Sequence, residues 1–144
     1  MGAQHAGHSV EVNVSPARFY ELVTDFETYP SFVPNQSAVR VLEREGDRWR
    51  AEFELSVAKK LTYVLDLVGV PGESLTWELV SGDMMQTNIG GWELEALPDG
   101  RTRATYYIDV ALKGFVPRSI TRSMIERTMP MNLEAFRLEA ERRG

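Results

Sequence analysis

Apolar and polar residues alternate with a period of two along most of the chain up to residue 112, and this pattern predicts β-strands. In RWRAEFELSV (48–57), Trp49 and Phe53 fall on one side and Arg50 on the other, as in an antiparallel strand with one wet face. Similar alternation predicts strands at 8–14, 37–45, 59–70, 74–80, 86–97 and 103–112. Turn residues such as those at 98–100 (Pro-Asp-Gly) predict short connections. We therefore expect a curved antiparallel sheet of about seven strands.

Helical spacing occurs near both ends of the chain. The segment SPARFYELVTDF (15–26) offers Ser15 as an N-cap and Pro16 for the first helical position. It is followed by FETYPSFVPNQS (26–37), whose large apolar residues predict a second short helical turn that covers one end of the core or of a cavity. From about residue 117 to 143 the period becomes helical again, and a helix of that length is about 40 Å long. Such a helix is long enough to cross the sheet.

The long helix has a wider apolar face than packing on a sheet requires. Two groups make up this face: Ile120, Met124, Met131, Ala135 and Leu138 cluster together, and Ile125, Met129 and Phe136 lie further round. Methionine adapts to varied partners, and Pro130 is expected to kink or break the helix. The surplus apolar width indicates either an additional packing partner or a cavity between helix and sheet.

Composition narrows the possible functions. The 144 residues include no cysteine, which excludes disulfides and thiol nucleophiles, and the net charge of -5 disfavours a phosphate-binding surface for nucleic acid. No apolar run approaches the ~20 residues that cross a bilayer, so we expect no stable membrane insertion and a cytoplasmic location. Residues 1–8, which include both histidines (His5 and His8), are expected to form a flexible tail ahead of one domain at 9–144.

Three segments resemble a known superfamily: SPARFYELVTDFETYPSFVP (15–34), GGWELEALPDGRTRATYYIDVALKG (90–114) and the end of the long helix, LEAFRLEAERR (133–143). They are similar to the START-like superfamily of polyketide cyclases/dehydrases and lipid-transport proteins (SRPBCC), and most similar to its coenzyme Q-binding group. That group usually has Trp-Cys where this chain has Asn35 and Gln36. The resemblance implies an α+β helix-grip fold (START/Bet v 1-like), with the curved sheet wrapped around the C-terminal helix and two short helices after the first strand. It also implies an internal apolar cavity.

The resemblance and the apolar faces together predict which residues surround that cavity. The expected wall residues are Phe32, Val33, Phe53, Leu55, Tyr63, Trp77, Leu79, Trp92, Leu94, Tyr106, Ile108, Ile120, Met124 and Met131. The expected rim residues are Tyr29, Met84, Met85, Phe115 and Val116. Packing of the core without a ligand is the alternative for each of them.

Candidates for acid–base chemistry are few, because no histidine lies in the predicted domain. The weak candidates are Tyr63, Asp66, Asn88, Tyr106 and Tyr107. Asp66 would act as an acid or base only if its face of the strand at 61–70 were buried, and the pattern alone does not decide which face is inward. No metal site and no cofactor are expected.

Three functions fit the sequence. The first is binding, and in some members transport or presentation, of a hydrophobic small molecule such as a lipid, an isoprenoid quinone or a polyketide. The second is an aromatase/cyclase or dehydratase that acts on a bound polyketide chain, so the sequence leaves open whether the protein is an enzyme. The third is a ribosome- or protein-interaction module, because one bacterial branch of the superfamily resembles a ribosome-association toxin. The oligomeric state is not predicted.

Overall fold

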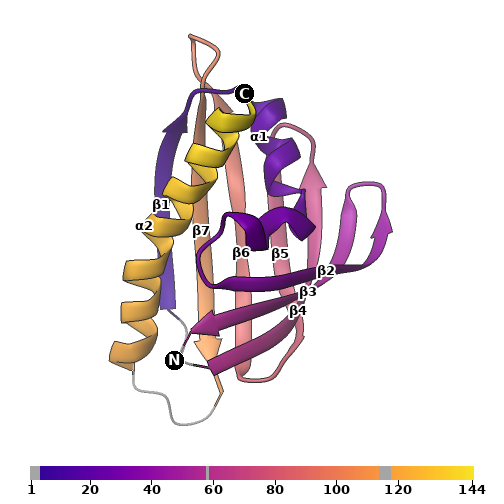
Figure 1. Cartoon of the computed structure of the whole chain (residues 1–144), viewed down its shortest axis with the longest axis vertical. Helices are drawn as coiled ribbons and strands as arrows, with labels where there is room; N and C mark the ends of the chain where they lie inside the picture. Colours follow the sequence, from indigo (N-terminus) through magenta and orange to yellow (C-terminus); the bar gives the residue numbers. More distant parts are fainter. Residues whose placement is uncertain (1–3, 58, 114–117) are drawn as a thin grey trace.

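The computed structural model describes residues 4–57, 59–113 and 118–144. The elements follow the predicted order (Figure 1): β1 Gln4–Val12, α1 Pro16–Val23, the 3-10 helix η1 Phe26–Ser31, β2 Gln36–Glu45, β3 Arg48–Val57, β4 Lys59–Val70, β5 Ser74–Gly82, β6 Met85–Ala96, β7 Thr102–Leu112 and α2 Arg118–Arg143. This order and its geometry confirm the α+β helix-grip prediction.

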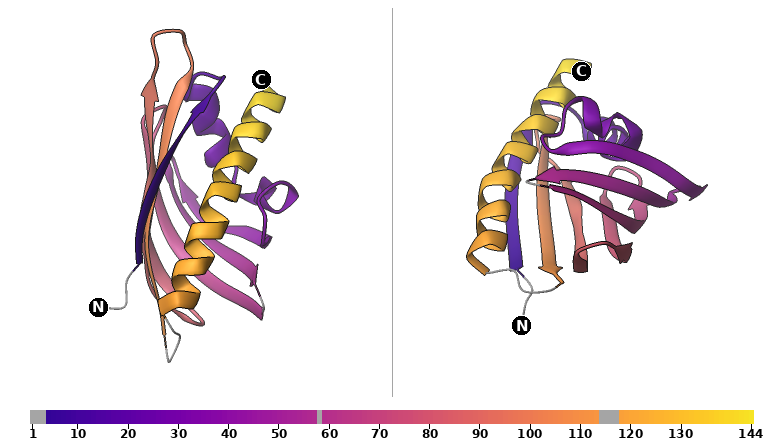
Figure 2. Two further views of the ribbon diagram at one scale, coloured as in Figure 1. Left: turned by 90° about the vertical axis from the view of Figure 1, so that its left-hand side faces the viewer. Right: turned by 60° about the horizontal axis from the view of Figure 1, so that its bottom comes forward.

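All seven strands form one antiparallel sheet in the order β1-β7-β6-β5-β4-β3-β2. Strands β2 to β7 follow one another as a meander, whereas β1 pairs with β7 at the other end of the chain. Glycines with positive φ close three of the hairpins, Gly46 (φ 62), Gly72 (φ 73) and Gly100 (φ 86), because a side chain would be strained there. Figure 2 shows the sheet curving beneath α2, which packs mainly along β1 and also contacts α1 and β7.

The first strand begins earlier than the sequence indicates. Residues 4–8 pair with 106–110 of β7, so the expected flexible tail through residue 8 is wrong from residue 4 onward. The alternation of Val10 and Val12 located only the second half of the strand, because the first half, QHAGH, has no apolar alternation to detect. His8 is an exposed residue of the strand opposite Tyr106.

The two short helices fit the predicted caps. The Ser15 side chain accepts a hydrogen bond from the Arg18 backbone N–H at 3.3 Å, and Pro16 is the first residue of α1. The buried face of α1 comprises Phe19, Tyr20, Leu22 and Val23. Helix η1 places Phe26 and Tyr29 in the core, and it packs against β2. The apolar residues of 26–34 therefore cover the inner side of the sheet.

The buried face of α2 differs from the expected one. In the part of α2 whose side chains are described, Met129, Leu133, Phe136 and Ala140 are buried, and their three- and four-residue spacing forms one stripe. Met131 and Leu138, assigned to the central apolar cluster from sequence, are 53% and 54% exposed, so that assignment is wrong. The helix also continues through Pro130, which lies on its exposed side.

Candidate functional site

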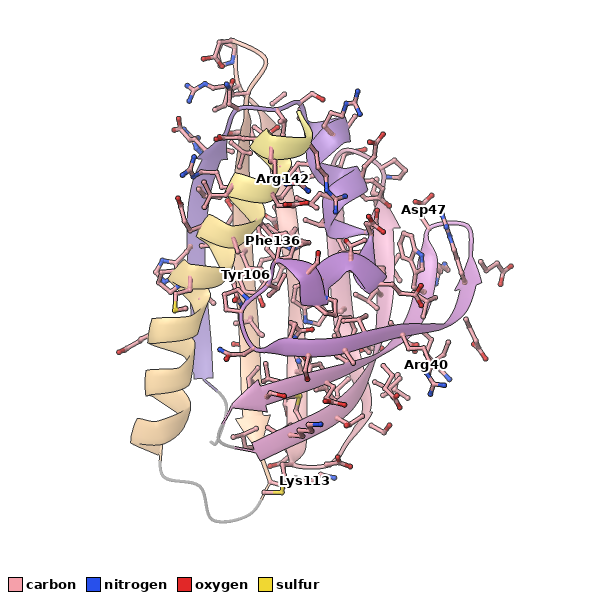
Figure 3. The ribbon with its side chains drawn as sticks, viewed as in Figure 1. Arg40, Asp47, Tyr106, Lys113, Phe136 and Arg142 are labelled. Carbon is pink, nitrogen blue, oxygen red and sulfur yellow. The ribbon has the colours of Figure 1, made fainter. Side chains whose placement is uncertain are left out.

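A cavity of about 90 Å³ lies between the inner face of the sheet, η1 and α2. Figure 3 shows Phe136 on α2 and Tyr106 on β7 in the region where the helix crosses the sheet. The described residues that line it are Phe26, Tyr29, Val33, Gln36, Phe53, Tyr63, Leu65, Leu67, Leu75, Trp77, Asn88, Trp92, Tyr106, Ile108, Asn132 and Phe136. Most of these side chains are aliphatic or aromatic, as expected of a site for an apolar molecule.

The structure shows which side chains of β4 point inward. Leu61, Tyr63, Leu65 and Leu67 are buried, so the side chains between them point to the outer face of the sheet. Asp66 is therefore outside the cavity, where its carboxylate forms an ion pair with Arg50 at 2.7 Å. The hydrogen bond from the Arg50 guanidinium holds the pKa of Asp66 below its usual range. The hypothesis that Asp66 is a buried acid or base is wrong.

Aromatic rings surround the cavity in edge-to-face contacts. The Phe136 ring lies 5.1–5.2 Å from the rings of Phe32, Tyr29 and Trp92. Trp92 in turn packs against Tyr106 at 5.0 Å, and on β3 and β4 Phe53 stacks on Tyr63 at 5.5 Å. Such contacts contribute beyond the burial of apolar area, so they stabilise this wall.

Some polar groups of the cavity are satisfied within the chain. The Tyr29 hydroxyl donates a short hydrogen bond to the Val23 carbonyl oxygen. The Trp77 indole N–H donates to Asn88 Oδ1 at 3.0 Å, and Asn88 Nδ2 contacts the Met85 sulfur at 3.5 Å. These groups stabilise the wall and have little hydrogen-bonding capacity left for a bound molecule.

Two amide oxygens of the lining are buried without a partner in the part of the chain that the structure describes: Gln36 Oε1 and Asn132 Oδ1. Gln36 begins β2 directly after Asn35, whose left-handed φ of 68° turns the chain into that strand. Its Nε2 donates to the Tyr63 hydroxyl at 3.3 Å. A buried acceptor left unpaired costs about 1–3 kcal/mol, so two in one cavity call for a physical explanation.

The ionisable groups among the described lining residues are tyrosines. Burial raises the pKa of Tyr29, Tyr63 and Tyr106 well above neutrality, so all three hydroxyls stay protonated. Among the described lining residues there is no Asp, Glu, His, Lys or Arg. Nor is any group of three His, Asp or Glu side chains in the described part of the chain placed to hold a metal ion. The described wall of the cavity is therefore uncharged.

The structure brings seven of the expected wall residues together around the cavity: Val33, Phe53, Tyr63, Trp77, Trp92, Tyr106 and Ile108. Asn88 and Tyr29 also line it, although Tyr29 was expected at the rim. Tyr107, on the opposite face of β7 from Tyr106, lies over Gly91 and is outside the cavity. Contact of these wall residues with a ligand stays a prediction.

Other expected residues do not line the cavity. Phe32, Leu55, Leu79 and Leu94 are partly buried and pack against the core, and Met131 is exposed to solvent. Met85, expected at the rim, is buried in the core and Met84 is half-buried. The side chains of Ile120 and Met124, and residues Phe115 and Val116, lie outside the described part of the chain.

Seven lining residues were not predicted as wall residues: Phe26, Gln36, Leu65, Leu67, Leu75, Asn132 and Phe136. For the leucines a signal existed, because Leu65 and Leu67 alternate with Asp66 on the face of Tyr63, and Leu75 shares the face of Trp77. Gln36 and Asn132 gave no signal, since a polar residue in a loop or a helix reads as exposed.

Residues 12–137 match the family model described as "Polyketide cyclase / dehydrase and lipid transport". The chain belongs to this family. One curated relative is the ribosome association toxin RatA of Pseudomonas aeruginosa. It is 30% identical to this chain over 125 residues, which cover 84% of the chain and 85% of the relative. The persistence and stress-resistance toxin PasT of Escherichia coli O6:H1 is 29% identical over 101 residues, 68% of the chain. The chain spans only 62% of the length of that relative.

Solved structures share the fold at low sequence identity. The Zhui aromatase/cyclase of Streptomyces sp. R1128 superposes with a TM-score of 0.88 at 20% identity, covering 98% of this chain and 95% of the other. A START superfamily protein from Mycobacterium smegmatis gives 0.85 at 20% identity, with 97% and 99% covered. A STAR-related lipid transfer protein from Xanthomonas axonopodis gives 0.81 at 14% identity, with 94% and 85% covered. These structural similarities establish the fold of this chain.

Proposed function

We propose that this chain binds an uncharged, hydrophobic small molecule in the cavity between α2 and the sheet. The observation that carries the proposal is the lining itself, in which aromatic and aliphatic side chains dominate and none of the described residues is charged. Burial of apolar surface supplies about 25 cal/mol per Å², whereas a charged group placed there would lose its hydration without gaining a counter-ion. The family description, which includes lipid transport, supports the same reading.

The lining argues against acid–base catalysis as the main function. A general acid or base works best with a pKa near the operating pH, and the tyrosines of this cavity are held far above it. A cyclase that works only by shaping a bound polyketide chain would still fit the site, because shaping needs no ionisable group. Binding is therefore the simpler proposal, and catalysis would be an addition to it.

The size of the cavity limits how a ligand is held. Sites for drug-sized molecules usually measure about 300–1,000 Å³, and this cavity measures about 90 Å³. Even a single-ring compound requires side chains to move apart, because a cavity that binds benzene measures about 150 Å³. A long lipid requires α2 or η1 to move away from the sheet. Helix α2 has few contacts with the strands other than β1, so an outward movement of the helix breaks little of the sheet.

A ribosome- or protein-association module is the second candidate. It is favoured by the RatA relative from Pseudomonas aeruginosa, which aligns over most of both chains. The outer sheet face exposes Val68, Val70, Val80 and Ile89, each at least 36% exposed, and exposed apolar residues of this kind are suited to contact another surface. The net charge of -5 opposes a contact that depends on ribosomal RNA phosphates.

The binding proposal is tested by filling the cavity. In Ile108→Phe the larger side chain occupies cavity volume, and we expect affinity for the neutral fluorescent probe 1-aminoanthracene to fall at least tenfold. The matched control is Ile89→Phe on the outer face, where Ile89 is 50% exposed and affinity should stay within twofold. Equal affinity in the two variants would contradict the proposal. Co-sedimentation with purified ribosomes, unchanged in Ile108→Phe, would instead support the second candidate.

A variant at Phe32 distinguishes a residue that only packs in the core from one that contacts the ligand. Its ring packs on Tyr29 and Phe136, with the Arg143 guanidinium 6.0 Å from its centre, but it does not line the cavity. We expect Phe32→Ala to lower the free energy of unfolding by about 1–3 kcal/mol, measured by urea denaturation. Affinity for 1-aminoanthracene should be unchanged within twofold. Loss of binding with unaltered stability would make Phe32 part of the binding site.

A further inference from the structure

Three polar side chains of the cavity come from different elements but face one space. Gln36 stands at the start of β2, Asn132 in the middle of α2 and Tyr106 on β7. All three line the same cavity of about 90 Å³. The two amide oxygens are buried and have no hydrogen-bond donor in the part of the chain that the structure describes.

Packing does not explain these amides. An apolar residue at either position would add to the aromatic wall and remove an unpaired acceptor, and asparagine is also a weak helix former within α2. Tyr29 and Asn88 show the opposite case in the same cavity, because their polar groups are paired within the chain. The contrast indicates that the oxygens of Gln36 and Asn132 are completed by hydrogen bonds from a bound molecule.

The unpaired atoms indicate which hydrogen-bonding groups the bound molecule must have. Amide oxygens accept hydrogen bonds, so the bound molecule must donate at two points. The Tyr106 hydroxyl can donate or accept, which suits a group that does both. Among the described residues that line the space, none is charged, so none would balance an ammonium or a carboxylate. A hydroxyl on an uncharged ring meets all these conditions, and the surrounding Trp77, Trp92 and Phe136 favour an aromatic ring.

We propose that Gln36 and Asn132 are specificity-determining residues that select an uncharged aromatic ligand with two hydroxyl donors, a hydroquinone or other diphenol, over the corresponding quinone. This inference rests on the proposed binding function. A quinone carbonyl only accepts hydrogen bonds, so it would leave both amide oxygens buried and unpaired. The two forms share one carbon skeleton, and the protein thereby distinguishes the reduced form of a ligand from the oxidised form.

The test compares tert-butylhydroquinone with tert-butyl-1,4-benzoquinone by anaerobic calorimetry on the full chain. The chain has no cysteine with which the quinone would react. We expect the hydroquinone to bind at least tenfold more tightly, a difference of about 1.4 kcal/mol. In Gln36→Met/Asn132→Leu the acceptors are replaced by apolar groups of similar size, and the preference should fall below threefold while quinone affinity is retained or improved.

The controls separate this inference from the proposed function. Gln86→Met removes an exposed amide of β6 and should leave the tenfold preference intact. Equal affinity of the two forms for the unaltered chain, with 1-aminoanthracene still bound, would overturn the inference and leave the binding function standing. Failure of the diphenol, the quinone and 1-aminoanthracene to bind would overturn both. A preference that survives in the double variant would show that Gln36 and Asn132 do not set it.

Discussion

Replacing Phe136 by alanine is expected to lower the free energy of unfolding by about 3–5 kcal/mol. Phe136 is 5% exposed, and its ring contacts those of Tyr29, Phe32 and Trp92, which come from η1, the loop after it and β6. Removal of this ring therefore weakens the packing of α2 on η1 and on the sheet. It also enlarges the cavity that is already present. Urea denaturation followed by tryptophan fluorescence measures the loss.

Leu138→Ala is the matched control for this prediction. Leu138 lies two residues away on the same helix and is 54% exposed, so its truncation removes little buried area. We expect its effect to stay within about 0.5 kcal/mol. Similar losses in the two variants would show that α2 presents a different face to the sheet.

The second large effect is expected at Gly90 in β6. A Cβ at this position would stand 2.4 Å from the Tyr107 carbonyl oxygen and 3.0 Å from the Trp77 ring. Backbone of the neighbouring strand cannot move aside without breaking the ladder between β6 and β7. We expect Gly90→Ala to cost about 3 kcal/mol, the upper end of the usual overpacking range, and to disturb the hydrogen bond from Trp77 to Asn88. Thermal unfolding followed by circular dichroism tests the prediction.

Gly7 provides the control for Gly90. It also lies in a strand, in β1, but the nearest atoms to a Cβ there are 3.7 Å away, which is ordinary contact. Because alanine restricts the unfolded chain more than glycine does, Gly7→Ala should be neutral or stabilising by up to about 1 kcal/mol. A destabilisation at Gly7 equal to that at Gly90 would mean that steric contact is not the cause.

The sheet was predictable because its signal is local. Each inner strand alternates apolar and polar residues, and the turns between strands carry Gly and Pro. The local pattern does not decide which face of β4 points inward, because Val64 and Val68 make the outer face as apolar as an inner one. The pairing of β4 with β3 decides which face is inward, because it places Asp66 opposite Arg50. Arg50 is known as the partner of Asp66 only from the register of the two strands.

The candidate site was predictable in outline and not in its polar detail. Large aromatic residues on inner faces, such as Trp77 and Trp92, indicate a cavity wall from sequence alone. The face of α2 was misplaced because its apolar residues form two groups, and the periodicity alone does not decide whether the group of Met131 or that of Met129 packs on the sheet. Gln36 and Asn132 became visible only when their burial and missing partners were known.

The pairing of β1 with β7 has a consequence for chain growth. Partners in this ladder, such as Val10 and Ala104, are separated by about a hundred residues, and contacts of such sequence separation form slowly. During translation β1 emerges first and has to wait for β7, while β2 to β7 can pair in order as they are made. Helix α2, which packs on β1, emerges last. The newly made protein is therefore expected to pass through a stage in which the sheet is formed and the part of its inner face that α2 covers is still exposed.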